Sequence, residues 1–457
     1  MRLLNLALIL CVISASAATG DEANQNAQPN TGLLYIGWAQ VDITPQKPVA
    51  LVGQLYKRIS QGVMDPLTAT ALALETRKAD DSVEQAIMVS CDVIYTRKAV
   101  SDRLKEVIKS RIADFDADKL FLNATHTHTA PGFIDGAFKG LYDVSKDQGV
   151  MKASEYADFF IERVAAGVVE AWKARKAGAM SWGLGHAVVG MNRRATYFDG
   201  SAAMYGATNI DSFAGIEGYE DHAVEMLFFW SPDADRKPTG IVINIACTAQ
   251  ETENLYEISA DFWHDVRIEL RKRISKDIFV FPQTAAAGDI SPHLLFRSRA
   301  EDAMRNLRGL SRRQEIARRI ADAVEDVLPL AGKYVAGEVQ FEHTVARLNI
   351  PEHEGGELPF YDTDPVTPIE FHVLRLGDVA IATNPFELYV DYGVRIKARS
   401  PAALTFLVQT ACRHVGYLPT IKAVRGGGYS ADKFIVGPDG GQVLVNETVR
   451  LINEMWN

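Results

Sequence analysis

The sequence has few cysteines, no apolar run long enough to cross a membrane, and no excess of positive charge. Four cysteines occur among its 457 residues, and the formal net charge is −10. That charge argues against a nucleic-acid partner, because phosphates favour a basic surface. A transmembrane helix needs about 20 apolar residues, so we expect no such segment in the mature chain. The hydrophobic content of 47% is typical of a globular protein with a substantial core.

The first residues have the pattern of a secretory signal peptide. Arg2 is followed by a short apolar run from residue 3 to 13 and by the small residues Ser-Ala-Ser-Ala-Ala. This pattern predicts a signal peptide over residues 1–17 and a secreted or periplasmic protein. A lipid anchor on Cys11 is less favoured, because Leu10 stands where a small residue is expected.

Residues 18–33 are largely polar and lack periodicity, so we expect a flexible lead-in. Cleavage of the signal peptide would leave Cys91, Cys247 and Cys412. Three cysteines cannot all pair, so at least one is expected to be free or bound to metal.

Short apolar runs alternate with amphipathic stretches from residue 34 to 457, without a linker or an internal sequence repeat. The alternation predicts an α/β fold in which helices cover a mixed, largely parallel sheet within one large domain, 34–457. The expected strands are Leu34–Asp42, Gln85–Ser90, Leu120–Thr127, Gly240–Ala246, Ile278–Pro282, Glu370–Leu376 and Val379–Ala382. The expected helices are Val100–Phe115, Ser154–Ala174, Ser259–Ser275, Arg312–Val327 and Pro385–Ala398.

The clearest chemical pattern is the pair His126 and His128 at the end of an apolar run. In an extended chain, residues two apart project from the same face, so both imidazoles are expected to point to one place. An Ala-Pro-Gly turn follows, which places the pair at the carboxyl end of the expected strand, where α/β folds gather their sites. The pair indicates metal binding or acid–base chemistry, the alternative being two hydrogen-bonded histidines in a polar core.

Other apolar runs also stop at polar residues, in the segments 247–251, 288–293 and 384–387. A hydrolytic zinc site needs about three protein ligands and an open position for water. His126, Cys247 and Glu387 are of suitable residue types. Their spacing does not decide the choice, because they lie far apart in the sequence.

Six segments in the same order resemble motifs of the neutral, non-lysosomal ceramidase family, and they span residues 37 to 429. These segments are GWAQVDITP, THTHTAPG, MNRRATY, ISADFWHD, GDISPH and GYLPTIKAVRGGGY. The resemblance implies zinc ligation by His126, Glu387 and the phenol of Tyr417. It also implies that His128 acts as the acid/base beside the metal.

The remaining roles implied by the resemblance concern the substrate. Tyr429 and Arg193 would hold the substrate carbonyl and the oxyanion formed from it, and Ser291 would contact the substrate near the cleaved amide. A phenol and a guanidinium are suitable hydrogen-bond donors to a developing oxyanion.

The sequence departs from the family at three places. Cys247 stands where the family has its second histidine ligand; it is either a thiolate ligand or a buried small residue. The segment GGGYSAD replaces an acidic, tyrosine-rich stretch. We also expect the family's C-terminal β-sandwich domain to be absent.

These observations predict a zinc-dependent hydrolase of a linear amide, and the resemblance implies a small-molecule or lipid substrate of the N-acyl-sphingosine (ceramide) class. Two alternatives stay open. The same zinc site could cleave another amide or ester, such as a carbohydrate-linked one, or the fold could serve as a metal-free binding protein.

Overall fold

The computed structural model describes residues 31–233, 235–353, 366–432 and 434–457. Its main architecture is three sheets of closely similar topology. The first sheet contains β1 (Gly32–Asp42), β5 (Thr68–Arg77), β6 (Val83–Cys91) and β7 (Leu120–Ala124). The second contains β9 (Ala179–His186), β14 (Ala223–Trp230), β15 (Pro238–Ile245) and β17 (Phe279–Thr284). The third contains β20 (Phe341–Leu348), β21 (Ile369–Leu376), β22 (Val379–Thr383) and β24 (Leu404–Val408).

The strands of each sheet pair in the same way: two antiparallel pairings come first, and one parallel pairing follows. The parallel pairs are β6–β7, β15–β17 and β22–β24. The predicted α/β layering is confirmed in this mixed form, but the prediction of a largely parallel sheet is wrong. It rested on strands joined through helices, and it overlooked the hairpin partners, which pair antiparallel.

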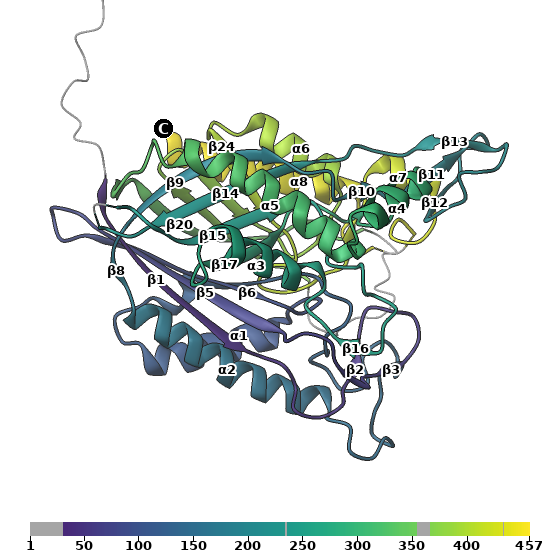
Figure 1. The fold of residues 1–457 in the computed structure, drawn as a ribbon, viewed down its shortest axis with the longest axis horizontal. Helices are drawn as coiled ribbons and strands as arrows, with labels where there is room; N and C mark the ends of the chain where they lie inside the picture. Colours follow the sequence, from purple (N-terminus) through teal and green to yellow (C-terminus); the bar gives the residue numbers. More distant parts are fainter. Residues whose placement is uncertain (1–30, 234, 354–365, 433) are drawn as a thin grey trace, which may run out of the picture. The chain divides into compact units, whose positions relative to one another are not determined.

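Two helices accompany each sheet, one inside the parallel crossover and one after it (Figure 1). The pairs are α1 (Lys98–Arg111) with α2 (Ala153–Lys173), α3 (Phe262–Arg273) with α5 (Arg312–Ala331), and α6 (Val390–Arg399) with α8 (Pro438–Trp456). The described chain therefore repeats one β-β-β-α-β-α unit three times. The sequence itself predicted no internal repeat. The three copies share topology and burial but no recognisable sequence, so the repetition is visible only in the structure.

Shorter elements connect and extend the three units. They are β2 (Ala50–Leu51), β3 (Arg58–Ile59), β4 (Gly62–Val63), η1 (Ala117–Lys119), β8 (Lys176–Ala177), β10 (Met191–Asn192), β11 (Arg194–Tyr197), β12 (Ala202–Met204), β13 (Phe213–Ile216), β16 (Glu257–Ile258), β18 (Ile290–Ser291), α4 (Ser298–Leu307), β19 (Glu338–Val339), β23 (Glu387–Leu388), β25 (Tyr417–Leu418) and α7 (Ile421–Gly426). The expected signal peptide and most of the lead-in lie outside the described residues, and β1 already begins at Gly32.

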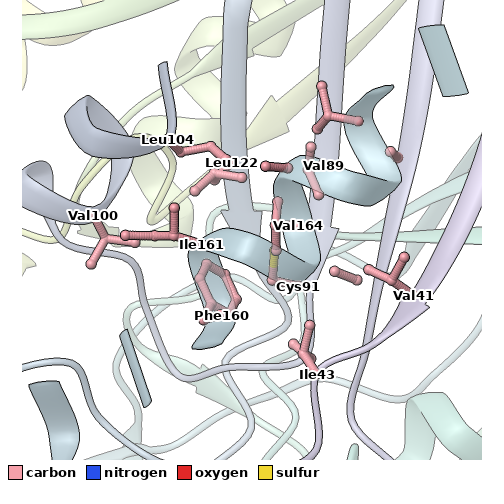
Figure 2. Packing of buried hydrophobic residues seen from close by; sticks show 14 of the residues in the cluster. Val41, Ile43, Val89, Cys91, Val100, Leu104, Leu122, Phe160, Ile161 and Val164 are labelled. Atoms are coloured by element: carbon pink, nitrogen blue, oxygen red, sulfur yellow. The ribbon is translucent and has the colours of Figure 1, made fainter. Parts of the chain in front are cut away.

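Hydrophobic side chains form one core among the three sheets and one core beneath each pair of helices. The central core contains Trp38 from the first sheet, Phe281 from the second and Phe406 from the third. Figure 2 shows the outer core of the first unit, in which Cys91 lies among aliphatic side chains of the sheet and of α2. Burial on both faces explains why inner strands such as β14 and β15 are apolar almost throughout, whereas β9, at the edge of its sheet, alternates between buried and exposed residues.

The carboxyl ends of the parallel strands meet at one edge of the three sheets. Thr284, at the end of β17, donates from its hydroxyl to the carbonyl of Ala124 at 3.4 Å. The backbone carbonyl of Thr284 accepts a hydrogen bond from the amide of Gln409, which follows β24, at 3.0 Å. The polar segments that follow these strands are thereby brought together.

Candidate metal and hydrolytic site

His126 lies just beyond β7, in a strained backbone conformation. The strand ends at Ala124, and His126 has a φ of +65°, while its amide donates to the carbonyl of Val93 at 3.0 Å. The expected strand to Thr127 therefore ends three residues early. A non-glycine residue in the left-handed region costs about 1–3 kcal/mol, and such strain concentrates at functional sites.

The two imidazoles of the His-x-His pair nevertheless lie together, with ring centroids 5.1 Å apart. The hydroxyls of Thr127 and Thr129 both donate to the backbone carbonyl of Ser259, at 2.8 and 3.0 Å. These bonds hold the loop and leave the histidines free to face the other strand ends.

Glu387 is the acidic centre of the site, and it is 4% exposed. Its Oε2 lies 3.6 Å from Nε2 of His126, and its Oε1 accepts a hydrogen bond from Nε2 of His414 at 2.9 Å. In the parallel pair β23–β25, Glu387 stands directly opposite Tyr417. An imidazole, a carboxylate and a phenol from three distant segments are thus neighbours.

The protonation states of these groups suit a cation. Burial opposes ionisation of Glu387, but the hydrogen bond from His414 and the nearby His126 lower its pKa to about 2. Burial lowers the pKa of His126 to about 4. At neutral pH, an ionised carboxylate therefore faces an unprotonated imidazole, which is the form of histidine that binds metals.

Arg193 lies beneath the site and is fully enclosed, with 2% exposure. Its guanidinium donates to the carbonyl of Gly288 at 2.9 Å, to the hydroxyl of Tyr417 at 3.4 Å and to Oε1 of Gln250 at 3.2 Å. The positive charge is therefore held against the phenol that stands beside Glu387.

Gln250 fixes the tautomer of His128. Because Arg193 donates to Oε1 of Gln250, the amide nitrogen of Gln250 must face His128, whose Nε2 lies 3.0 Å away. That ring nitrogen accepts, so the proton of a neutral His128 sits on Nδ1, which is 3.6 Å from the carboxylate of Glu253. Burial lowers the pKa of His128 well below its usual value, so the ring is neutral.

Tyr429 marks the solvent side of the site. It is 50% exposed, and its ring meets that of Tyr417 edge to face, with centroids 5.8 Å apart. Partial burial raises the pKa of Tyr429, so its phenol keeps its proton and remains a hydrogen-bond donor.

The other two expected site residues, Ser291 and Cys247, are also buried, but they have different surroundings. Ser291 pairs with Met191 in the β10–β18 ladder, which connects it to the segment of Arg193. Cys247 belongs to the core of the second unit, and its thiol donates to the backbone carbonyl of Val189 at 3.5 Å. Burial raises the pKa of Cys247 well above its usual value.

Three residues in the site lacked a clear signal in the sequence: His414, Gln250 and Glu253. His414 lies three residues before Tyr417 and follows β24, a strand that was not predicted. Had that strand been recognised, the polar residues after it would have been expected at the same sheet edge as His126.

The residues present fit a divalent cation such as zinc. The donor set comprises His126, Glu387 and Tyr417, with His414 on the second carboxylate oxygen. Two ligand atoms on a tetrahedral zinc lie about 3.3 Å apart, given bonds of about 2.0–2.1 Å. The 3.6 Å between His126 and Glu387 is close to that separation and too long for a hydrogen bond.

A comparison with solved structures identifies the architecture. The chain superposes on the neutral ceramidase from Pseudomonas aeruginosa with a TM-score of 0.70 and 16% sequence identity, over 93% of this chain and 75% of that one. It has the neutral ceramidase fold. A ceramidase complexed with C2 gives a TM-score of 0.68 and 15% identity, over 93% of this chain and 76% of that chain.

The resemblance to neutral ceramidases is therefore confirmed at the level of the fold. No protein-family model matches the sequence, and no curated protein gives a significant match. Among the described residues, none of the helices combines the length and the apolar character needed to cross a bilayer.

Proposed function

We propose that this chain is a metal-dependent hydrolase of a linear amide, with N-acyl sphingoid lipids as its substrate class and zinc as its metal. The observation that carries the proposal is the placement of Glu387 between His126 and His414, directly opposite Tyr417. The ceramidase fold supports the substrate class.

The metal would be held by His126, Glu387 and Tyr417, and His414 would orient the Glu387 carboxylate through its hydrogen bond. The sequence left Cys247 as a possible thiolate ligand, but its thiol contacts the carbonyl of Val189 within an apolar core. His414, from another strand end, donates to the second oxygen of the same carboxylate that faces His126, so it would support this ligand from outside the metal shell.

The chain's own residues have distinct roles in this proposal. Zinc, when bound, would supply Lewis-acid activation of water near neutral pH. His128 would act as the acid/base, and to take up a proton its Nε2 would exchange the hydrogen bond from Gln250 for one to the reacting group. Tyr429, which is half exposed, would donate to the substrate's carbonyl oxygen as negative charge develops there, and the buried Arg193 would support this charge through its hydrogen bond to Tyr417.

The test combines metal content with hydrolysis. We expect purified wild type to hold zinc and to cleave N-acyl substrates, and His126→Ala to lose both zinc and at least about 100-fold in kcat/KM. His186→Ala, a change at an exposed histidine, is the matched control. Full activity of metal-free protein would refute the proposal.

Two further variants test the supporting role of His414 and the thiolate alternative at Cys247. His414→Ala should reduce zinc affinity, whereas Cys247→Ser should leave it unchanged; the reverse result would assign the ligand to Cys247. A panel of short, water-soluble amides and esters separates the ceramide class from another substrate. Wild type that neither binds zinc nor cleaves any member would support the binding-protein alternative.

A further inference from the structure

A second cluster of metal-ligating residues lies in the third unit, apart from the proposed hydrolytic site. Within the described residues, Glu370, His372 and Cys412 bring one ligand atom each to within 4.8 Å of one another. Glu370 and His372 are two apart in β21 and so project from one face of the sheet. Cys412 reaches them from the loop after β24, where it has a φ of +64°.

A relay of hydrogen bonds sets the orientation of the His372 ring. Nδ1 of His343 lies 3.0 Å from the carbonyl of Gln85, which can only accept, so this nitrogen carries a proton. Nε2 of a neutral His343 is then an acceptor, and Nδ1 of His372, 2.9 Å away, donates to it. A neutral His372 is left with a bare lone pair on Nε2.

That lone pair faces a carboxylate. Nε2 of His372 lies 3.1 Å from Oε1 of Glu370. In this tautomer both facing atoms, Nε2 of His372 and Oε1 of Glu370, carry lone pairs, and a cation between them would satisfy both.

We propose that Glu370, His372 and Cys412 bind a thiophilic divalent cation of the zinc type, at a site distinct from that around Glu387. Ligand atoms on such an ion lie about 3.3 Å apart, close to the 3.1 Å observed. The relay through His343 is the arrangement by which metal-binding histidines are commonly held, with the second ring nitrogen donating to a fixed acceptor.

Binding of the ion is accompanied by the loss of one proton. Cys412 would bind the ion as its thiolate. Binding of the ion ionises the thiol, and that proton leaves to solvent, while His372 binds through its existing lone pair. Two other cationic side chains lie beside Glu370. Nζ of Lys105 is 2.6 Å from its Oε1, and the guanidinium of Arg347 is 4.0 Å from its Oε2.

Solvent can reach the cluster, since the Glu370 side chain is 21% exposed. The site also has a connection to the hydrolytic one, because Cys412 and His414 share a loop. The amide of Cys412 donates to the carbonyl of Leu122 at 2.9 Å, which anchors that loop to β7.

The test is a titration of metal-free full-length protein with Co²⁺, following the near-ultraviolet band of a cobalt–thiolate bond. We expect one thiolate-bound cobalt per chain in wild type and in Cys91→Ser, a control for a buried free thiol. The band should disappear in Cys412→Ser, and Glu370→Gln should weaken cobalt binding by about 10-fold or more.

Two outcomes would overturn the proposal: no thiolate band in folded wild type, or a band that persists in Cys412→Ser and disappears in Cys247→Ser. The His126→Ala variant keeps this test independent of the proposed function. It should retain the band even though the hydrolytic site has lost a ligand. Circular dichroism and thermal melts verify that each variant is folded.

Discussion

Gly53 shows how closely one residue can constrain the proposed acid/base. It has a φ of +108°, and a Cβ placed there would lie 2.5 Å from Nδ1 of His128. We expect Gly53→Ala to displace the imidazole and to lower kcat/KM by about 100-fold. The free energy of unfolding should fall by about 1–3 kcal/mol from backbone strain. Steady-state kinetics and denaturant unfolding measure the two effects.

Gly140→Ala is the matched control for this change. Gly140 also has a positive φ, +85°, but no atom lies within 4 Å of its added Cβ. It should show the backbone strain without the loss of activity. Equal losses of kcat/KM in the two variants would mean that strain, and not contact with His128, is responsible.

At the scale of elements, a buried ion pair joins the end of β6 to α3 of the next unit. Asp92 accepts two hydrogen bonds from Arg267, at 2.9 and 3.0 Å, and also binds the amide and hydroxyl of Thr68. Asp92→Asn leaves a buried guanidinium without its counter-charge. We expect the free energy of unfolding to fall by about 3–5 kcal/mol, measured by urea denaturation.

The exposed pair Arg103–Asp158 provides the comparison, with side chains 56% and 67% exposed. Asp158→Asn should change stability by less than about 1 kcal/mol, because solvent screens such pairs. A similar cost for both substitutions would contradict the argument that burial makes the Asp92 pair important.

The sequence predicted some elements well and others not at all, for physical reasons. The amphipathic helix expected over Ser154–Ala174 is confirmed as α2, because one helical face must be apolar to cover the sheet. β5, with the sequence TATALALETR, was missed: it is buried almost throughout and lacks alternation, and Ala, Leu and Glu favour helices. Missing such hairpin partners led to the wrong expectation of parallel pairing.

The candidate site could be predicted only where local chemistry or family motifs marked it. His126, Glu387 and Tyr417 were expected together, and the structure makes them neighbours. His414 could not be placed, because its contact with Glu387 depends on how two loops fold back over the sheet edge. That is a tertiary property that a single sequence does not encode locally.

At the scale of the whole molecule, the central core connects all three units and should make them unfold together. Phe281 is fully buried among side chains of the three sheets. Phe281→Ala should lower the free energy of unfolding by about 3–5 kcal/mol. Hydrogen exchange should show that β7, β17 and β24 lose equal protection. Reduced protection confined to β17 would mean that the units unfold independently.

The threefold arrangement also has a consequence for synthesis. Histidine and arginine side chains of the proposed centre come from the first and second repeats, whereas Glu387, His414 and Tyr417 come from the third. A nascent chain therefore lacks the complete proposed metal centre until residue 417 has left the ribosome. Any catalytic power of this kind would emerge abruptly once the third repeat has been made, not by degrees.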